Sequence, residues 1–121
     1  MAQILIVEDE PDVLLLLENR VRAAGHDVES AMDGETALEM ISAKRPKVIV
    51  LDWMMPRVSG IEVLERLRAE DPGHDVKVLM LTAKSQQSDI ERAYTAGADD
   101  FIVKPFSSRD LIDRVAALIV L

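Results

Sequence analysis

Short, continuous apolar runs alternate along the chain with segments of helical periodicity. The runs cover residues 4–7, 48–51, 78–81 and 101–103. Such runs are typical of strands that are buried on both faces of a parallel sheet. Residues 27–31 alternate between polar and apolar side chains instead, which is typical of an edge strand. The pattern therefore predicts five strands and limits the chain to folds built on a parallel sheet.

Helical patterns fill the intervals between these runs. Pro11 suits the first turn of a helix and Gly25 its end, which predicts a helix over residues 11–24. Its predicted core stripe is Val13, Leu17 and Val21. Further helices are predicted over residues 34–44, 60–69 and 85–96, and from an N-cap at Ser107 to the last residue. The segment 85–96 has the fewest apolar candidates for a core face.

Five strand–helix units in 121 residues leave little room for insertions or linkers. Crossovers between parallel strands are right-handed, and the helices then cover both faces of the sheet. We therefore predict one domain, residues 1–121, of the α/β class, with a doubly wound (βα)5 five-stranded parallel sheet.

Composition excludes several classes of protein. A formal net charge of −8 opposes direct binding to the phosphate backbone of nucleic acids. The absence of cysteine excludes disulfides and cysteine-ligated metals. No apolar run approaches the roughly 20 residues of a membrane span, and the acidic start of the sequence is unlike a signal peptide. We expect a cytoplasmic protein without membrane contact.

Chemically active residues follow the predicted strands. Glu8 and Asp9 come after the first strand and Asp52 after the third, whereas Thr82 and Lys104 come after the fourth and fifth. In open α/β sheets, ligands bind beyond the carboxyl ends of the strands. Three carboxylates brought together there could not all stay ionised without a compensating cation. Carboxylate and water ligands suit Mg²⁺ better than zinc.

Such an ion lets an anionic phosphoryl donor approach a carboxylate nucleophile, as metals do in other phosphoryl transfers. The Lys104 ammonium can pair with one phosphate oxygen, and the Thr82 hydroxyl can donate a hydrogen bond to another. The group of residues thus favours phosphoryl chemistry at Asp52.

Four segments carry a resemblance to a known family: ILIVEDEP (4–11), LDWMMPRVSG (51–60), LMLTA (79–83) and GADDFIVKPF (97–106). The sequence resembles the receiver domain of two-component response regulators along essentially its whole length. The resemblance implies a flavodoxin-like sheet of strand order 2-1-3-4-5. It also implies a phosphorylation-dependent signalling switch, which assists its own aspartyl phosphorylation and dephosphorylation but is not a conventional turnover enzyme.

The resemblance also assigns roles to single residues. Asp52 matches the aspartate that accepts a phosphoryl group from a sensor histidine kinase or a phosphotransfer protein. Glu8 and Asp9 match the acidic pair that holds Mg²⁺ beside it, with Mn²⁺ as an alternative ion. The Met54 carbonyl oxygen is expected to contribute a further ligand. Lys104 matches the lysine that contacts the acyl phosphate, and the peptide bond that follows it is expected to be cis.

Two further matches concern the response to phosphorylation. Thr82 matches the hydroxyl residue that moves to the phosphoryl group, and Phe101 the aromatic residue that rotates inward with it. These movements are expected to reshape the surface of the fourth helix, fifth strand and fifth helix, which controls an output domain or partner. Met54 and Lys84, two residues after Asp52 and Thr82, are expected to slow the loss of the phosphoryl group.

The last helix carries a second apolar set, Ile112, Ala116 and Ile119, beside the core set Leu111, Val115 and Leu118. Exposed apolar surface of this kind often marks an interface. We expect a homodimer through the fourth helix, fifth strand and fifth helix, a docking face, or a linker to an output domain. The charged residues Asp99, Asp100, Asp110 and Arg114 resemble the dimer pattern of receivers joined to winged-helix DNA-binding domains, from which Ile90 departs.

Other interpretations remain open. A degenerate receiver that acts as a phosphorylation-independent protein-binding module has the same fold. A haloacid-dehalogenase-like phosphatase needs a second aspartate where Met54 stands, and an FMN-binding flavodoxin needs an anion-binding loop where Glu8 and Asp9 stand. Trp53 is expected to be partly exposed without a catalytic role, and His26 and His74 to be surface residues.

Overall fold

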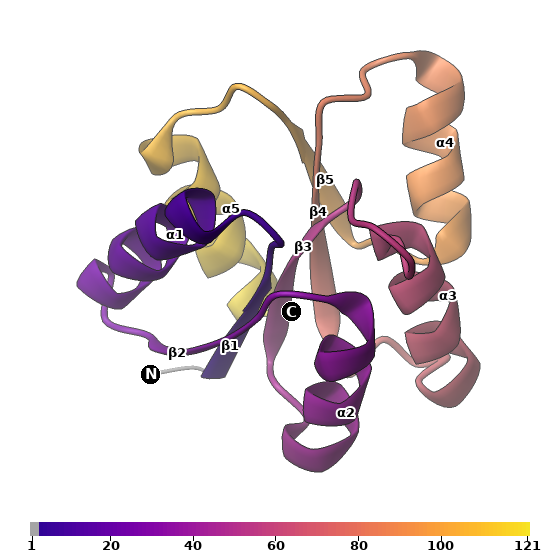
Figure 1. Cartoon of the computed structure of the whole chain (residues 1–121), viewed down its shortest axis with the longest axis horizontal. Helices are drawn as coiled ribbons and strands as arrows, with labels where there is room; N and C mark the ends of the chain where they lie inside the picture. The colour runs from indigo at the N-terminus through magenta and orange to yellow at the C-terminus, as the bar shows by residue number, and fades with distance from the viewer. Residues whose placement is uncertain (1–2) are drawn as a thin grey trace.

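A computed structural model describes residues 3–121, in which five strands and five helices alternate (Figure 1). The strands are β1 (Gln3–Val7), β2 (Asp27–Ala31), β3 (Val48–Asp52), β4 (Lys77–Thr82) and β5 (Asp100–Val103). The helices are α1 (Pro11–Ala23), α2 (Gly34–Lys44), α3 (Gly60–Glu70), α4 (Gln87–Ala96) and α5 (Ser108–Ile119). None of these helices is long and apolar enough to span a membrane.

The strands form one parallel sheet in the order β2-β1-β3-β4-β5. This order confirms the predicted doubly wound fold. The edge position of β2 agrees with its alternating sequence, and the central strand β3 is buried at every residue. Because β1 and β3 are neighbours whose helices lie on opposite faces, their loops diverge at the carboxyl end of the sheet and leave room for a site there.

Helices cover both faces of the sheet. Figure 1 shows α1 and α5 on one side and α2, α3 and α4 on the other, and the buried side chains form one apolar core on each side. Leu17 and Val21 of α1 are buried, as predicted, but Leu14 takes the third core position and Val13 is only half-buried. The predicted core residues Val63, Leu64 and Leu67 of α3, and Leu111, Val115 and Leu118 of α5, are buried.

Side-chain caps fix three helix starts. Ser59 and Ser107 accept hydrogen bonds from backbone N–H groups in the first turns of α3 and α5, and Asp33 does the same for α2. The predicted N-cap of α5 is therefore confirmed.

Helix α4 begins two residues later than predicted. Its N-cap residue, Gln86, makes no side-chain cap hydrogen bond, so the sequence carries no local mark of the start. Of the residues of α4, all within the described range, Ala93 alone is buried; Ile90 is half-buried and Tyr94 is exposed. This helix is therefore held by little apolar contact, as its sparse pattern predicted.

A buried guanidinium ties α3 to the α4–β5 connection at the amino end of the sheet. Arg68 is 9% exposed and donates from Nε to the Gly97 carbonyl oxygen at 2.9 Å. Its Nη1 donates to Asp71 Oδ2 at 3.0 Å and to the Val76 carbonyl oxygen at 2.7 Å, and its Nη2 to Asp99 Oδ2 at 2.7 Å. All three guanidinium nitrogens are thus bound inside the fold.

The neighbouring residues Asp99 and Asp100 have different surroundings. Asp99 also accepts the Val78 N–H at 2.8 Å and lies 2.7 Å from His74 Nδ1, whereas Asp100 pairs with Arg114 at 2.8 Å. The Asp99 carboxylate is thus occupied inside the protein, and the expected dimer surface stays a prediction. The His74 side chain is 35% exposed, which agrees with the predicted surface position, although its Nδ1 also lies 2.7 Å from Asp99; His26 is half-buried.

Candidate functional site

The carboxyl ends of the strands bring the predicted site residues together. Asp52 and Thr82 are the last residues of β3 and β4, Glu8 follows β1, and Lys104 follows β5. Glu8, Asp52 and Thr82 are buried. Since parallel strands end at one edge of the sheet, four loops deliver these side chains to one place.

Three carboxylates form a compact cluster there. Glu8, Asp9 and Asp52 each offer an oxygen atom, and these oxygens lie within 4.8 Å of one another. Glu8 Oε2 accepts the backbone N–H of Asp9 at 2.9 Å. Its other oxygen, Oε1, is buried and accepts no hydrogen bond from residues 3–121. The Lys104 ammonium lies 3.5 Å from this oxygen without forming a hydrogen bond to it. A buried acceptor left in this way is costly, so the cluster is suited to a cation that binds oxygen.

The electrostatics of the cluster agree with this. Burial, together with the hydrogen bond and charge of Asp52, raises the pKa of Glu8 to about 7, although Lys104 opposes the shift. Glu8 therefore takes up a proton near neutral pH in the metal-free protein. A divalent cation would favour its ionised form.

Lys104 supplies a positive charge to the cluster. Its Nζ lies 3.1 Å from Asp52 Oδ1 and 3.5 Å from Glu8 Oε1. Burial lowers the pKa of this ammonium, but the two carboxylates outweigh burial and the net pKa is raised. The peptide bond between Lys104 and Pro105 is cis, as the family pattern implied. The ammonium is thus held charged beside the carboxylate of Asp52.

Thr82 and Phe101 lie in the neighbouring strands β4 and β5. The Thr82 hydroxyl oxygen accepts the backbone N–H of Lys84 at 2.8 Å. Phe101 is half-buried on the side of α4 and meets Tyr94 edge to face, with ring centroids 6.3 Å apart. Both residues therefore contact the thinly packed α4 segment or the loop that leads to it.

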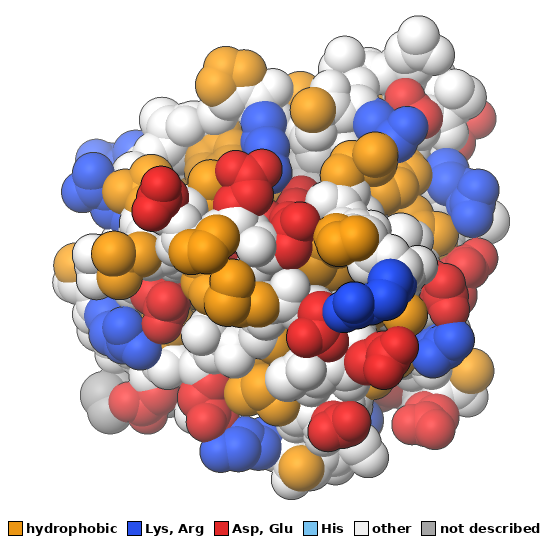
Figure 2. All heavy atoms as spheres, in the orientation of Figure 1, with side chains coloured by type: hydrophobic (Ala, Val, Ile, Leu, Met, Phe, Trp, Pro, Cys, Tyr) orange, Lys and Arg blue, Asp and Glu red, His pale blue; other side chains and the backbone are white. Residues whose placement is uncertain are grey.

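The residues after Asp52 differ sharply in exposure. Met54 is 60% exposed, whereas Trp53 is only 8% exposed. The prediction that Trp53 is partly exposed is wrong, because its indole packs into the core beneath the β3–α3 loop and lies under the Lys84 side chain. On the face shown in Figure 2, acidic side chains near the middle are flanked by hydrophobic ones.

Gly60 fixes the loop that carries these residues. Its N–H donates to the Trp53 carbonyl oxygen at 2.8 Å, and a Cβ at this position would overlap the Asp52 carbonyl oxygen and lie 2.8 Å from the Trp53 Cα. The close approach therefore requires a residue without a side chain.

The Gly60→Ala variant is expected to be less stable than the wild type by about 1–3 kcal/mol, the usual cost of overpacking. Alanine favours a helix over glycine by at most about 1 kcal/mol, which does not offset an overlap with backbone atoms. Gly73→Ala is the matched control, because a Cβ there meets nothing within 4 Å. Urea unfolding of both variants checks the prediction, and equal stabilities would contradict it.

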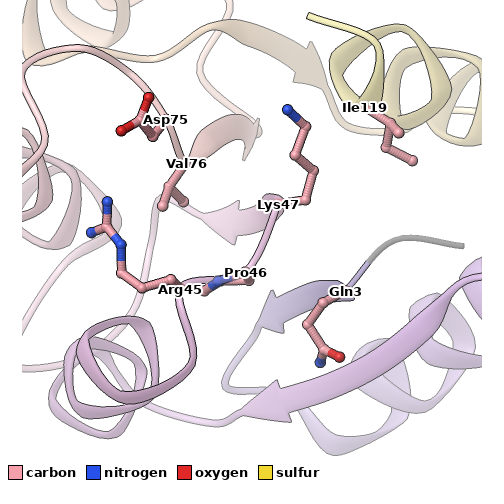
Figure 3. A pocket seen from close by; sticks show the side chains of 7 residues that line it. All are labelled: Gln3, Arg45, Pro46, Lys47, Asp75, Val76 and Ile119. Atoms are coloured by element: carbon pink, nitrogen blue, oxygen red, sulfur yellow. The ribbon is translucent and has the colours of Figure 1, made fainter.

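A hollow of about 460 Å³ lies at the opposite end of the sheet. It is lined by Gln3, Arg45, Pro46, Lys47, Asp75, Val76 and Ile119 (Figure 3). These residues stand at the starts of strands and at the end of α5, far along each strand from the carboxylates. Glu8, Asp52 and Lys104, whose charges shift the pKa values of Glu8 and Lys104, lie in the acidic cluster and not in this hollow.

Two features of the site were not predicted from the sequence. The Lys84 ammonium lies over the Trp53 ring at 5.6 Å from its centroid. Gly60 packs against the backbone of Asp52. The glycine inside the segment LDWMMPRVSG was visible as part of a motif, but its contact with Asp52 depends on the path of the whole loop.

Comparisons with known proteins agree with this geometry. The model of the response regulator receiver domain matches residues 4–116. The chain is 44% identical over 117 residues to the transcriptional regulatory protein PrrA of Mycobacterium tuberculosis, covering 97% of this chain and 49% of that protein. It is 38% identical over 119 residues to the phosphate regulon transcriptional regulatory protein PhoB of Rhizobium meliloti, covering 98% and 52%. The chain thus spans about half the length of these curated relatives.

Solved structures show the same fold. The receiver domain of the Francisella response regulator 1452 superposes with a TM-score of 0.93 at 32% identity, covering 99% of this chain and 98% of that one. The chemotaxis protein CheY4 of Vibrio cholerae gives a TM-score of 0.90 at 29% identity, with 98% of each chain covered. The chain belongs to the response regulator receiver domain family of two-component signalling proteins.

Proposed function

We propose that residues 1–121 form a receiver domain that is switched by a phosphoryl group on Asp52. The observation that carries the proposal is the position of this carboxylate, 3.1 Å from the Lys104 ammonium and within the cluster formed with Glu8 and Asp9. A nucleophilic carboxylate, a fixed cation and further acidic ligands are the parts that phosphoryl transfer to aspartate needs.

The residues present fit a magnesium ion. Glu8, Asp9 and Asp52 would supply carboxylate oxygens, and the Met54 carbonyl oxygen would supply a further ligand, with Mn²⁺ as an alternative ion. The buried Glu8 Oε1, which accepts no hydrogen bond from the described residues, supports a cation at this place. When bound, the ion would neutralise charge on the transferring phosphoryl group.

The donor would be a phosphohistidine of a sensor kinase or a phosphotransfer protein. An oxygen of Asp52 attacks phosphorus, the P–N bond breaks as the O–P bond forms, and the departing imidazole nitrogen takes up a proton. Lys104 then donates to a phosphoryl oxygen in place of its contact with the free carboxylate. The Thr82 hydroxyl donates a hydrogen bond to another phosphoryl oxygen once its own oxygen no longer accepts the N–H of Lys84.

The response is a population shift between two arrangements of the β4–α4 loop. Movement of Thr82 toward Asp52 vacates volume that Phe101 fills, and the surface of α4, β5 and α5 changes with it. The sparse packing of α4, in which Ala93 alone is buried, supports a helix that moves at small cost. Like the receiver domains of transcriptional regulators, this one signals rather than turning over a substrate.

The test is the intact mass of the wild-type protein after incubation with acetyl phosphate. One added phosphoryl group is expected with Mg²⁺ and none with EDTA. Absence of any addition with acetyl phosphate, phosphoramidate or a phosphorylated kinase, in Mg²⁺ or Mn²⁺, would favour the alternative of a degenerate receiver that binds partners without phosphorylation.

The length of the relatives supports a proposal about the output. Because this chain spans about half of PrrA and PhoB, we propose that the α4–β5–α5 surface controls an effector domain or partner and supports a homodimer. Ile112 and Ile119 of α5 are half-buried and Ala116 is exposed, so part of this surface is apolar. Arg114 already pairs with Asp100 and Asp110 within the chain, which limits its use across a dimer.

Met54 and Lys84 are proposed to prolong the phosphorylated state. Met54 is exposed beside the acceptor, where an apolar side chain shields the acyl phosphate from water. Met54→Asn, which places an amide there to orient water, is expected to speed dephosphorylation about fivefold, roughly 1 kcal/mol in the barrier. The decay of the phosphorylated mass measures this. Met32→Asn, at a methionine that is 45% exposed, is the control and is expected to decay at the wild-type rate.

A further inference from the structure

Two lysines lie in the segments that follow β4 and β5, and they are held in different ways. Lys104 pairs with Asp52 and Glu8. Lys84 forms no ion pair with any of residues 3–121; its ammonium lies over the face of the Trp53 indole, 5.6 Å from the ring centroid. This is within the range of a cation–π contact. Among the described residues, the Lys84 ammonium is therefore held by an aromatic ring and not by a carboxylate.

Lys84 is held at its backbone as well. Its N–H donates to the Thr82 hydroxyl oxygen at 2.8 Å, and Thr82 is fully buried. The main chain of Lys84 thus fixes the Thr82 side chain, while its own side chain is fixed by Trp53. If the ammonium left the ring, the loop after β4 would lose one of the two contacts that keep the Thr82 hydroxyl in its observed direction.

The Trp53 ring is fixed in place by its packing in the core. Trp53 is buried. Its backbone N–H donates to the Leu81 carbonyl oxygen at 2.9 Å, and its backbone carbonyl oxygen accepts the Gly60 N–H at 2.8 Å. Lys84 is half-buried, whereas the indole packs in the core and cannot turn away without disturbing it. Asp52 is in register with Leu81 near the end of β4, so the loop that carries Lys84 begins beside the strand end that carries the acceptor. A phosphoryl group on Asp52 would add two negative charges at this end of the sheet.

We infer that Trp53 is a positioning residue for the phosphorylation switch: its indole holds the Lys84 ammonium, and through Lys84 it keeps Thr82 turned to the loop until a phosphoryl group is present. The inference rests on the proposed function of Asp52. A phosphoryl dianion attracts the Lys84 ammonium more strongly than the quadrupole of the Trp53 ring does, because the dianion carries full negative charges. The Trp53–Lys84 contact thus stabilises the unphosphorylated arrangement and lowers affinity for a phosphoryl group.

A double-mutant cycle tests this, with beryllofluoride and Mg²⁺ as the probe for the acyl phosphate and calorimetry as the readout. Trp53→Leu frees the lysine without removing its charge and is expected to tighten binding about two- to fivefold, the range that an exposed cation–π contact supplies. In a Lys84→Met background the same replacement is expected to leave the affinity unchanged. Trp53→Phe, which keeps an aromatic face, is expected to lie between wild type and Trp53→Leu.

The cycle separates positioning from a purely structural role. If Trp53→Leu changes the affinity equally in both backgrounds, the indole acts only through packing and the inference is overturned. If Trp53→Leu does not fold, Trp53→Phe replaces it in the same cycle, with a smaller expected tightening. If beryllofluoride does not bind the wild type, the proposed function itself is contradicted. If it binds but the effects of the Trp53 and Lys84 replacements are additive, only the role of Trp53 is contradicted.

A second readout needs neither metal nor phosphoryl analogue. Trp53 is the only tryptophan of the chain, so its fluorescence reports on the charge above its ring. Lys84→Met is expected to change the emission of the metal-free protein. The matched control is Lys44→Met, at a lysine that pairs with Glu29 on the edge strand and is expected to leave emission unaltered. Identical spectra for Lys84→Met and wild type would overturn the inference.

Discussion

The Asp52→Asn variant is expected to gain no phosphoryl group under conditions in which the wild type gains one. The replacement keeps the shape of the side chain and its place at the end of β3, but it removes the ionised oxygen that attacks phosphorus. The expected effect is therefore complete loss of labelling and not a slower rate. Intact mass after incubation with acetyl phosphate and Mg²⁺ measures it.

The neighbouring carboxylates make this a sharp test of the acceptor. Asp9→Asn removes a proposed metal ligand but leaves Asp52, so slower labelling that recovers with more Mg²⁺ is expected. Asp12→Asn, at an exposed carboxylate in the first turn of α1, is the control and is expected to label like the wild type. Labelling that persists in Asp52→Asn would show that another residue accepts the phosphoryl group.

Much of this arrangement was predictable from the sequence. The apolar runs gave the strands to within a residue at each end, and right-handed crossovers limited the order of the sheet. Parallel strands end at a common edge, so residues at the carboxyl ends of four of them had to lie near one another. The motif around GADDFIVKPF identified Lys104 and the cis bond that follows it.

What sequence did not predict depends on packing between distant segments. Val13 and Leu14 are adjacent and both apolar, and the rotation of α1 against the sheet decides which is buried. Trp53 has a polar–apolar ring that suits either environment, and its burial depends on how the β3–α3 loop closes.

The same limit applies to Asp99 and Asp100. Neighbouring side chains of an extended segment point to opposite sides, so one carboxylate of the pair must face inward. The sequence does not say which, because the deciding partner is Arg68, 31 residues away on another helix. The structure assigns Asp99 to the interior and Asp100 to the surface beside Arg114.

The inward position of Asp99 makes Arg68 a residue of large effect on stability. Arg68→Met keeps most of the apolar stem but leaves Asp71 and Asp99 without their main cation and two carbonyl oxygens without a donor. Breaking a buried ion pair by removing one partner costs about 3–5 kcal/mol, since the remaining charge is left in a poorly solvated place. Arg45 and His74 keep weaker contacts to the two carboxylates, so the lower part of this range is expected.

Arg66→Met provides the matched control on the same helix. Arg66 pairs with Glu62 on the exposed surface of α3, and pairs of this kind contribute less than about 1 kcal/mol. Urea unfolding of the two variants should therefore separate them by about 2–3 kcal/mol at neutral pH. If Arg68→Met were no less stable than Arg66→Met, the buried network would not hold the α4–β5 connection. In that case α4 would have to be anchored by its apolar contacts, of which Ala93 is the one fully buried residue in the described helix.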